Sequence, residues 1–532
     1  MAARPFLRTL SRALHSRTAG WTRWDFMAWG LLAASLAFRL VFFDQARFAA
    51  DEALQYHIAR EVGDFRLFPT QGTLTTVAEN ARIPGGAYFL IIGLPQFLFH
   101  SPEASMALIV LVSVAGLGLG YRLFRREYGP PAALAAMLLA AFNPFHLFHS
   151  DRIWNPNLMA FFGFLALTLL VRAVRGEGRR PLFWLAFLLV AVPQIHLSCV
   201  LLAALAAVLL AVARPRDLPW RQGLWGAAAG FGTYVPYFVA DGLKGFPNTR
   251  LLLGHAATAT APVAEAFRAM YYMVLYPAGE MSYFVAKGSA SPMTEWGFYG
   301  GEGLRQMGAF LRWGSPWGWA LTGVLILALL LSLAAALATL GHVLRDLVRR
   351  GREAVRQDPL AFLALVNLPL VAMMFWGRKL FFPHYTMVVF PLALVPAAWA
   401  VSRISQEGWH RGILALLVPI AATQGFLSAR YYQEEEAKIS VPVYRETARR
   451  ILEDSPGVPV ALECALPRTQ CSGYPVHVLA IHEMGRDFRE DRNARRRYTL
   501  TLPGEERARG AIRVWDLGPV WLVRRDRDAS RP

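Results

Sequence analysis

Long apolar runs separated by short arginine-rich segments constrain this sequence more strongly than any other feature. A helix needs about 20 apolar residues to cross a bilayer, and somewhat fewer where flanking side chains extend to the interface. Eleven runs are candidate spans, with bounds near 26–43, 104–121, 132–148, 157–174, 182–194, 196–213, 223–240, 317–340, 360–376, 383–401 and 412–428. The hydrophobic content of 55% also exceeds the roughly 45–50% of soluble domains. The sequence therefore predicts a polytopic α-helical membrane protein.

One further apolar run, 84–99, is interrupted by Pro84-Gly85-Gly86 and Pro95, and proline breaks a regular helix. Lys and Arg concentrate in short cytoplasmic loops. If 84–99 does not cross, the basic N-terminus shares the cytoplasmic side with every arginine-dense loop: 122–131, 172–181, 213–222, 341–358 and 401–412. We therefore predict an interfacial or re-entrant helix at 84–99. The C-terminus then lies on the outer side of a bacterial inner (plasma) membrane, provided that 182–213 splits at Pro193-Gln194 into a hairpin.

The basic character of the chain fits this topology. The net charge of +18 comes from clusters between apolar runs, which orient spans and do not form one basic face, so nucleic acid is not an expected partner. Residues 1–25 are basic and lack an apolar core followed by a small-residue cleavage site. We expect a cytoplasmic N-terminal segment and a first span that is retained as an anchor.

The hydropathy pattern changes near residue 429, where long apolar runs give way to shorter segments of mixed polarity. We expect a transmembrane domain at 26–428, with external loops at 44–103 and 241–316, and a periplasmic α/β domain at 429–532. An amphipathic helix should open this domain, followed by short strands in VPVALECA (458–465), YPVHVLAI (474–481), RYTLTL (497–502), IRVWDL (512–517) and VWLVRR (520–525). Cys464 and Cys471 could form a disulfide or stay reduced, and a disulfide would place the tail outside the cytoplasm.

Ionisable groups near membrane depth are costly and are candidates for function. The first outer loop is richest in them: Asp51, Glu52, Glu79, Asn80 and Arg82. A carboxylate at the mouth of a membrane cavity can act as a general base toward an acceptor hydroxyl or amine. Alternatively, Asp51 caps the amphipathic helix LQYHIAREV (54–62), because Asp is a favoured cap and acidic residues suit the first turn.

Two further polar clusters lie at outer turns. The first comprises His146, His149, Asp151, Arg152 and Asn155. As an alternative to binding, Asp151 and Arg152 would mark a water-facing helix end. The second cluster, at the start of a late span, comprises Arg378, Lys379, His384 and Tyr385. Its cations could hold a phosphate or could equally serve as interface anchors. His196, in the predicted hairpin turn, is expected to be a packed histidine rather than a ligand.

Other catalytic signatures are absent from the sequence. It contains no Walker loop, HExxH, GxSxG, or cysteine–histidine set with zinc spacing. We therefore expect no obligatory cofactor; a divalent metal would be compatible with the sequence but is not indicated by it.

Four segments resemble the GT-C superfamily of membrane glycosyltransferases, particularly the branch of protein O-mannosyltransferases and aminoarabinose (lipid A) transferases. In chain order they are ADEALQYHIARE (50–61), ENARIPGGAYFLIIGLPQFLF (79–99), HSDRIWNPNLMAFFGFLALTLL (149–170) and RKLFFPHYTMVVFPLALV (378–395). Because each motif is weak alone, their order over roughly 400 residues carries the resemblance. The C-terminal segment does not resemble the β-trefoil domain of the eukaryotic mannosyltransferases.

This resemblance implies a sugar donor carried on a polyprenyl phosphate and an inverting, direct displacement by an acceptor at the outer face of the membrane. Asp51 would be the general base, with Glu52 positioning it or the sugar. Arg82 would take the place of the basic residue before the family's proline pair, which is Pro84-Gly85 here. Arg378 and Lys379 would neutralise the leaving lipid phosphate. The acceptor could be a lipid, a polysaccharide or a protein.

Two other functions remain open at this point. A lipid or sugar transporter, or flippase, would also have many spans with intramembrane charges. It would predict inverted repeats with broken spans in both halves, and the sequence shows neither. A non-catalytic envelope assembly subunit would bind a partner through its tail domain and would not need Asp51.

Overall fold

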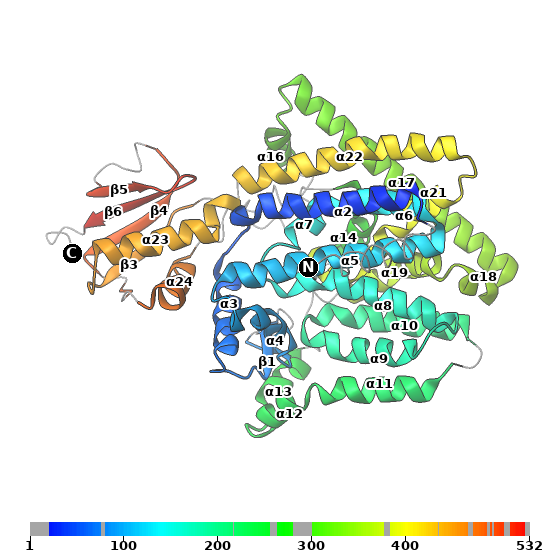
Figure 1. The fold of residues 1–532 in the computed structure, drawn as a ribbon, viewed down its shortest axis with the longest axis horizontal. Coiled ribbons are helices and arrows are strands. Elements are labelled where there is room, and N and C mark those ends of the chain that lie inside the picture. The colour runs from blue at the N-terminus through cyan, green and yellow to red at the C-terminus, as the bar shows by residue number, and fades with distance from the viewer. Residues whose placement is uncertain are drawn as a thin grey trace, which may run out of the picture.

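The structure is a computed structural model, and helices dominate it (Figure 1). It describes residues 21–75, 80–215, 218–255, 263–279, 301–376, 383–434, 436–466, 472–486, 490–491, 494–504 and 511–526. A bundle of long helices occupies most of the molecule, and a small α/β domain is attached at one end (Figure 1).

Six segments of the described chain are long and apolar enough to cross a membrane. They are α2 (Arg23–Val41), α5 (Pro102–Tyr128), Asn155–Val174 with α8 (Met159–Val174), α17 (Pro316–Arg350), Pro383–Ser402 with α20 (Phe390–Ala393) and α21 (Val395–Ser402), and α22 (Glu407–Glu434). Shorter helices cover most of the other predicted spans: α6 (Pro130–Ala141), α9 (Pro181–Ala191), α10 (Val200–Ala213), α11 (Trp220–Gly232) and α19 (Pro359–Phe375). The predicted polytopic helical fold is confirmed, while the count of about eleven spans remains a prediction.

Proline starts many of these helices. Pro102, Pro130, Pro181, Pro316 and Pro359 are each the first residue of a helix. At this position proline loses no intrahelical hydrogen bond, and its fixed φ already suits the helix. Prolines at the N-terminal edges of these apolar runs therefore mark where the helices begin.

Contacts between arginine-rich segments show that four of the predicted cytoplasmic loops lie together. Arg175 pairs with Glu127 at 2.5 Å. Tyr128 donates a hydrogen bond to Asp358 at 2.7 Å, and Arg356 donates one to the carbonyl of Ala213 at 2.7 Å. The start of α9 and the end of α10 thus lie at the same end of the bundle, and the chain breaks between them at 192–199. The predicted hairpin at 182–213 is confirmed.

The run at 84–99 forms only a short, broken helix. It contains α4 (Ala87–Gly93) and a 3₁₀ turn at Leu94–Phe97. Gly85 has a φ of +89°, and a Cβ on Gly86 would lie 1.9 Å from the carbonyl oxygen of Pro69. These glycines let the chain turn sharply before α4, which packs against α3 (Ala50–Gly63). A helix of this length does not span a bilayer, in agreement with the prediction.

The remaining elements surround the bundle. The segment after α2 continues through α3 into an antiparallel pair, β1 (Gln71–Leu74) and β2 (Arg82–Pro84). Shorter helices alternate with the bundle helices along the chain: α7 (Pro144–Phe148), α12 (Val235–Gly242), α13 (Pro247–His255), α14 (Ala264–Leu275), α16 (Gly301–Leu311) and α18 (Arg352–Gln357). Figure 1 places α3 and α4 at the end that carries the α/β domain, and α18 at the opposite end.

The C-terminal domain packs α23 (Val441–Asp454) and α24 (Tyr474–Met484) with a four-stranded sheet of order β3-β4-β6-β5. Strand β3 (Val460–Cys464) is parallel to β4 (Arg496–Thr501), whereas β5 (Arg513–Asp516) and β6 (Trp521–Asp526) complete the sheet antiparallel. The prediction of a strand at 474–481 is wrong, because this segment is α24. Parallel neighbours need a long crossover connection, and α24 lies within the crossover from β3 to β4.

Polar contacts join this domain to the bundle. The guanidinium of Arg445 on α23 bonds Glu103 at the start of α5 at 2.7 Å, and also Glu483 on α24 at 2.5 Å. The amide of Phe48 donates to the carbonyl of Ile439 at 2.8 Å. Cys464 is disulfide-bonded, whereas Cys199 is free and buried. Cys471 lies outside the described residues.

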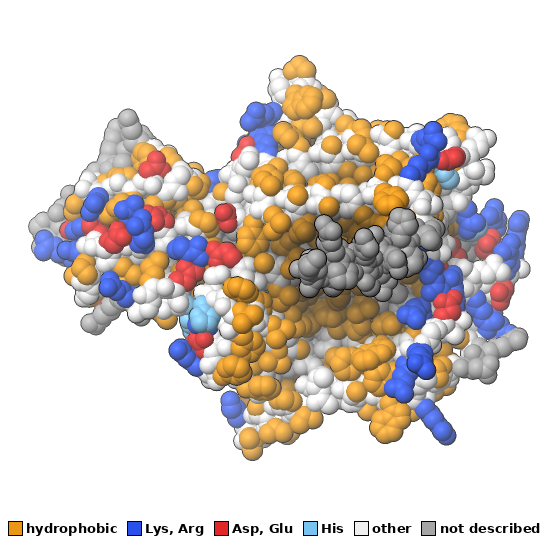
Figure 2. All heavy atoms as spheres, viewed as in Figure 1, with side chains coloured by type: hydrophobic (Ala, Val, Ile, Leu, Met, Phe, Trp, Pro, Cys, Tyr) orange, Lys and Arg blue, Asp and Glu red, His pale blue; other side chains and the backbone are white. Residues whose placement is uncertain are grey.

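Figure 2 shows that hydrophobic side chains cover the visible side of the bundle, while Lys and Arg gather toward its ends and on the C-terminal domain. Large apolar side chains remain exposed along single helices, for example Leu337 on α17 at 58% and Leu224 on α11 at 71%. Exposing so many apolar side chains to water would be costly. The apolar surface of the bundle therefore supports a location within a lipid bilayer.

Candidate active site

A cavity of about 240 Å³ collects residues from all the polar clusters that the sequence indicated in the described part of the chain. Its polar lining comes from four separate segments: Asp51, Thr75, Asn155, His196, Ser198, His384 and Tyr385. Apolar and aromatic residues complete it: Leu74, Ile83, Trp154, Pro156, Leu197, Met374 and Phe375. The cavity therefore lies where the first outer loop meets the predicted outer ends of several helices.

Asp51 presents a carboxylate to this cavity from the first turn of α3. The helix starts at Ala50, and it is the carboxylate of Glu52 that accepts a hydrogen bond from the amide of Ala49, at 3.0 Å. Glu52 thus supplies the N-terminal cap, so the alternative that Asp51 serves as the cap is wrong. Asp51 is exposed, and its side chain can meet a molecule in the cavity.

Glu52 is buried behind Asp51 in a cluster of charges. It is 2% exposed, and its carboxylate lies 3.5 Å from Nε of Arg47 and 4.0 Å from Arg152. Arg47 is itself buried and also interacts electrostatically with Asp51 and Glu436. Buried charges are tolerated when paired, and this cluster holds the start of α3 beside the cavity.

The second outer turn is buried rather than water-facing. Asp151 is 4% exposed and Arg152 is 5% exposed, so the alternative that they mark a solvated helix end is wrong. Tyr432 on α22 donates a hydrogen bond to Asp151. The guanidinium of Arg152 lies 5.1 Å from the centre of the Trp154 ring, a cation–π distance. This turn therefore connects the charge cluster to an aromatic wall of the cavity.

Aromatic rings form that wall. The ring centres of Trp154 and His384 are 4.5 Å apart, as are those of His384 and Tyr385. His196 lies 5.8 Å from Tyr385 and shares a hydrogen bond of 2.7 Å with Ser198. His196 is packed, as predicted, but it also lines the cavity. Flat rings beside a carboxylate suit a sugar, whose faces are apolar and whose hydroxyls need hydrogen bonds.

Burial raises the pKa of Asp151 to about 6, and the hydrogen bond from Tyr432 and the charge of Arg152 oppose this rise. The folded protein therefore holds the proton on Asp151 more strongly than the unfolded chain does. Stability from this group is present at low pH and is lost as pH rises from about 4 to about 6. The shift from 3.8 to about 6 corresponds to roughly 3 kcal/mol.

We expect Asp151→Asn to remove this dependence, because asparagine does not titrate. The free energy of unfolding of the wild-type protein, relative to that of the variant, should fall by up to about 3 kcal/mol between pH 4 and pH 6. Denaturant unfolding in detergent at a series of pH values measures this difference. Asp44→Asn, at an exposed aspartate, is the control, and parallel pH profiles for wild type and Asp151→Asn would contradict the expectation.

The predicted site residues separate into four groups. Asp51, His384 and Tyr385 line the cavity. Glu52, Asp151 and Arg152 are buried beside it. Arg82 lies on β2, where its amide bonds the side chain of Asn248 at 2.7 Å, and it is not among the residues that line the cavity. Glu79, Arg378 and Lys379 lie outside the described residues.

Several residues of the buried charge cluster were not predicted. Arg39 on α2 bonds His146 at 2.9 Å and Ser150 at 2.9 Å, and it interacts electrostatically with Asp151. An arginine inside the first apolar run is a signal that could have identified it. Arg47 and Tyr432 carry no comparable signal, because their partners are distant in sequence.

Among the described residues, one group of three potential metal ligands occurs, and it lies outside this cavity: His57, Glu61 and His482. The cavity itself combines a carboxylate, two histidines and aromatic rings. The residues present can therefore accept a proton and bind a polar ring-shaped molecule.

Together, the helices and this site define an integral membrane protein whose cavity opens among interhelical loops. No protein-family model matches the sequence, and no curated protein matches it. Among solved structures, the chain is similar to ArnT from Cupriavidus metallidurans bound to undecaprenyl phosphate, with 13% identity and a TM-score of 0.53 over 94% of this chain and 98% of that chain. The apo state of the same protein gives 13% identity and a TM-score of 0.53 over 93% and 97%.

An oligosaccharyltransferase from Archaeoglobus fulgidus gives 14% identity and a TM-score of 0.46, over 86% of this chain and 62% of that chain. The similarity to ArnT extends over nearly the whole of both chains. The chain therefore has the fold of this ArnT structure, which agrees with the fold expected from the four ordered motifs.

Proposed function

We propose that this protein transfers a glycosyl group from a polyprenyl-phosphate-linked sugar to an acceptor at the outer face of the bacterial inner membrane. The observation that carries the proposal is the cavity that Asp51, His384 and Tyr385 line together. The GT-C fold adds support, because the ArnT structure that it resembles is bound to undecaprenyl phosphate.

In the proposed reaction, the carboxylate of Asp51 accepts the proton of an acceptor hydroxyl or amine. The acceptor then bonds to the anomeric carbon as the bond from that carbon to the phosphate oxygen breaks. The polyprenyl phosphate leaves with the bonding electrons. This single displacement inverts the anomeric configuration, and its oxocarbenium-like transition state needs a base on one face and stabilisation of the leaving phosphate on the other.

The surrounding residues would have separate roles. Glu52, paired with Arg47 and Arg152, would position Asp51 through the first turn of α3. Trp154, His384 and Tyr385 would bind the sugar or the phosphate. Arg378 and Lys379, which precede His384 by a few residues, would neutralise the leaving phosphate, and Glu79 and Arg82 would contact the acceptor side.

We further propose that the cavity and the C-terminal domain are periplasmic and the N-terminus cytoplasmic. The arginine-rich loops that contact one another include 122–131 and 341–358, and such loops are typically cytoplasmic. The disulfide at Cys464 fits an oxidising compartment for the tail. Nucleotide sugars are absent there, so a donor that has crossed the membrane on a lipid would supply the energy.

A donor panel tests the proposal. Purified protein in proteoliposomes is supplied with polyprenyl phosphates that carry different labelled sugars, together with membrane extracts as acceptors. We expect label from one donor class to move to an acceptor, with release of free polyprenyl phosphate. Movement of the intact donor across the bilayer without cleavage would instead support a transporter, and the absence of any transfer would contradict the proposal.

A further inference from the structure

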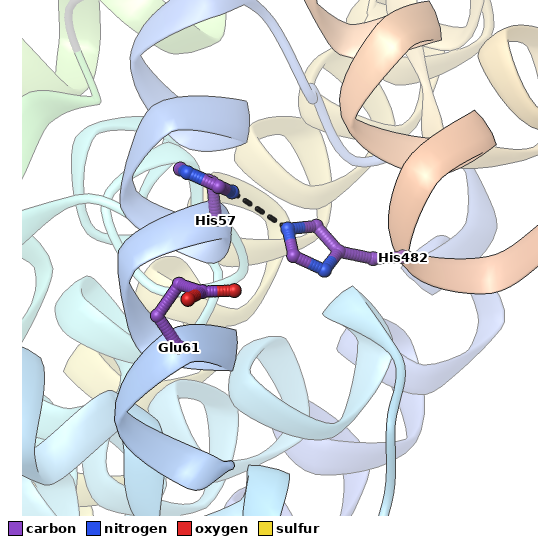
Figure 3. Close-up of side chains that lie close together, drawn as sticks. All are labelled: His57, Glu61 and His482. Atoms are coloured by element: carbon purple, nitrogen blue, oxygen red, sulfur yellow. Dashed lines mark hydrogen bonds between the residues drawn. The ribbon is translucent and has the colours of Figure 1, made fainter. Parts of the chain in front are cut away.

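His57, Glu61 and His482 lie together at the junction of the bundle with the C-terminal domain. Figure 3 shows His57 and Glu61 pointing from successive turns of α3 toward His482 on α24. The Nδ1 atom of His57 and the Nε2 atom of His482 are 2.6 Å apart. One ligand atom from each of the three side chains lies within 4.8 Å of the others. The cluster is therefore compact, although 425 residues separate its two histidines.

The spacing on α3 explains why two of these side chains share one face. Residues four apart on a helix are neighbours on its surface, and His57 and Glu61 have this spacing. His482 comes from the last turn of α24, which packs against α3. All three side chains are half-buried, so they are shielded by the two helices but remain accessible to small solutes.

The ligand chemistry matches zinc and similar divalent ions. Zinc binds histidine nitrogen and carboxylate oxygen at about 2.0–2.2 Å, and where the protein supplies three ligands, water can take the fourth tetrahedral position. Ligand atoms in a tetrahedral site of this size are about 3.3 Å apart. The two rings would separate slightly and Glu61 would approach them, which are movements of side chains rather than of the helices.

Neighbouring charges permit this rearrangement. The carboxylate of Glu61 lies 3.6 Å from Arg66, which also lies 3.9 Å from Asp64. Arg66 therefore keeps a carboxylate partner if Glu61 turns to a cation. Arg60, the other nearby cation, pairs with Asp64.

We propose that His57, Glu61 and His482 form a zinc-type divalent metal site that fastens α3 to the C-terminal domain. The metal adds a second cross-link beside the Arg445 contacts with Glu103 and Glu483. Since α3 begins next to Asp51, the site fixes the C-terminal domain to the helix that carries this carboxylate. The inference does not depend on the proposed glycosyl transfer.

Metal titration of the full-length protein tests this proposal. The protein is purified in detergent, freed of any affinity tag and stripped with a chelator, and then titrated with Zn²⁺ and with Co²⁺. We expect about one equivalent to bind per chain, with visible d–d absorption for Co²⁺ that indicates nitrogen ligands. Loss of a ligand in His57→Ala, His482→Ala or Glu61→Gln should weaken binding by more than about tenfold, because even indirect partners of metal ligands contribute 10–100-fold.

Thermal unfolding provides a second readout. Binding to the folded state alone stabilises it, so Zn²⁺ should raise the melting temperature of the wild-type protein, and a chelator should reverse the effect. His482→Gln, which removes the imidazole but retains hydrogen bonding, should lose this response while remaining folded. His477→Ala is the matched control, because His477 lies on the same helix and contacts Glu490 at 2.8 Å instead.

The proposal would be overturned if the wild-type protein bound neither ion, which would leave only a hydrogen-bonded histidine pair. It would equally be overturned if His57→Ala and His482→Ala bound metal as the wild type does. Selective loss of the metal-dependent melting shift in His482→Gln, but not in His477→Ala, would support it.

Discussion

Asp51→Asn should reduce the turnover number for sugar transfer by about 10²–10⁴-fold, the usual contribution of a general base. Asparagine has nearly the shape of aspartate but does not accept the acceptor's proton. Asp51 is exposed at the cavity and does not cap α3, so the substitution should leave the fold and donor binding intact. Initial rates at saturating donor, together with donor affinity measured separately, check this expectation.

Asp44→Asn is the matched control for this prediction. Asp44 belongs to the same outer loop and is also exposed, but it does not line the cavity. The control should transfer sugar at the wild-type rate. Equal rates for Asp51→Asn and wild type would remove Asp51 from the proposed mechanism. Asp151 and Glu79 would then be the next candidates for the general base.

Arg47→Met should destabilise the folded protein by about 3–5 kcal/mol, the usual effect of removing one partner from a buried ion pair. Arg47 is 6% exposed, and its Nε lies 3.5 Å from the carboxylate of Glu52. It also interacts with Glu436. Methionine of similar length would leave Glu52 with only the more distant Arg152 at 4.0 Å and would remove the positive charge that interacts with Glu436. The free energy of unfolding in detergent, from denaturant titration at neutral pH, measures the loss.

Two further variants make this test specific. Arg449→Met removes an exposed arginine that pairs with Glu446 at 2.6 Å, and a surface pair of this kind is screened by solvent and contributes little to stability. Arg47→Met combined with Glu52→Gln should be more stable than Arg47→Met alone, because it removes a buried carboxylate that would retain only the contact of 4.0 Å with Arg152. A single Arg47→Met variant as stable as Arg449→Met would show that the charge cluster does not hold the start of α3.

The bundle could be predicted from the sequence because its determinants are local. Apolar runs of sufficient length predict helices, and arginine clusters predict which loops share a side. The contacts of Glu127 with Arg175 and of Arg356 with the end of α10 agree with that arrangement. The short helix at 84–99 was also predictable, because Pro84-Gly85-Gly86 and Pro95 prevent a continuous span.

The site could be predicted only in part. Asp51, His384 and Tyr385 were identified because polar residues stand out at the ends of apolar runs, and they line one cavity. Burial was not predictable: Glu52, Asp151 and Arg152 are held by Arg47, Tyr432 and Trp154, which are partners brought close by folding. Likewise, no spacing in the sequence connects His57 with His482.

The C-terminal domain shows why a short alternating pattern is an unreliable guide. YPVHVLAI reads as a strand because valine and isoleucine alternate with other residues. In the structure it forms α24, which lies in the crossover between the parallel strands β3 and β4 and packs against α23 and α3. The topology of the sheet and the surface provided by α3 override the local β preference.

The most direct test of the proposed mechanism is a single-turnover reaction with a donor labelled with ¹³C in the sugar and ³²P in the lipid phosphate. We predict that the sugar moves to the acceptor with inverted configuration at the anomeric carbon, as seen by NMR. Free labelled polyprenyl phosphate should appear in equal amount. Retention of configuration, or a lipid-linked sugar that stays intact while the wild-type protein is active on it, would contradict direct displacement at Asp51.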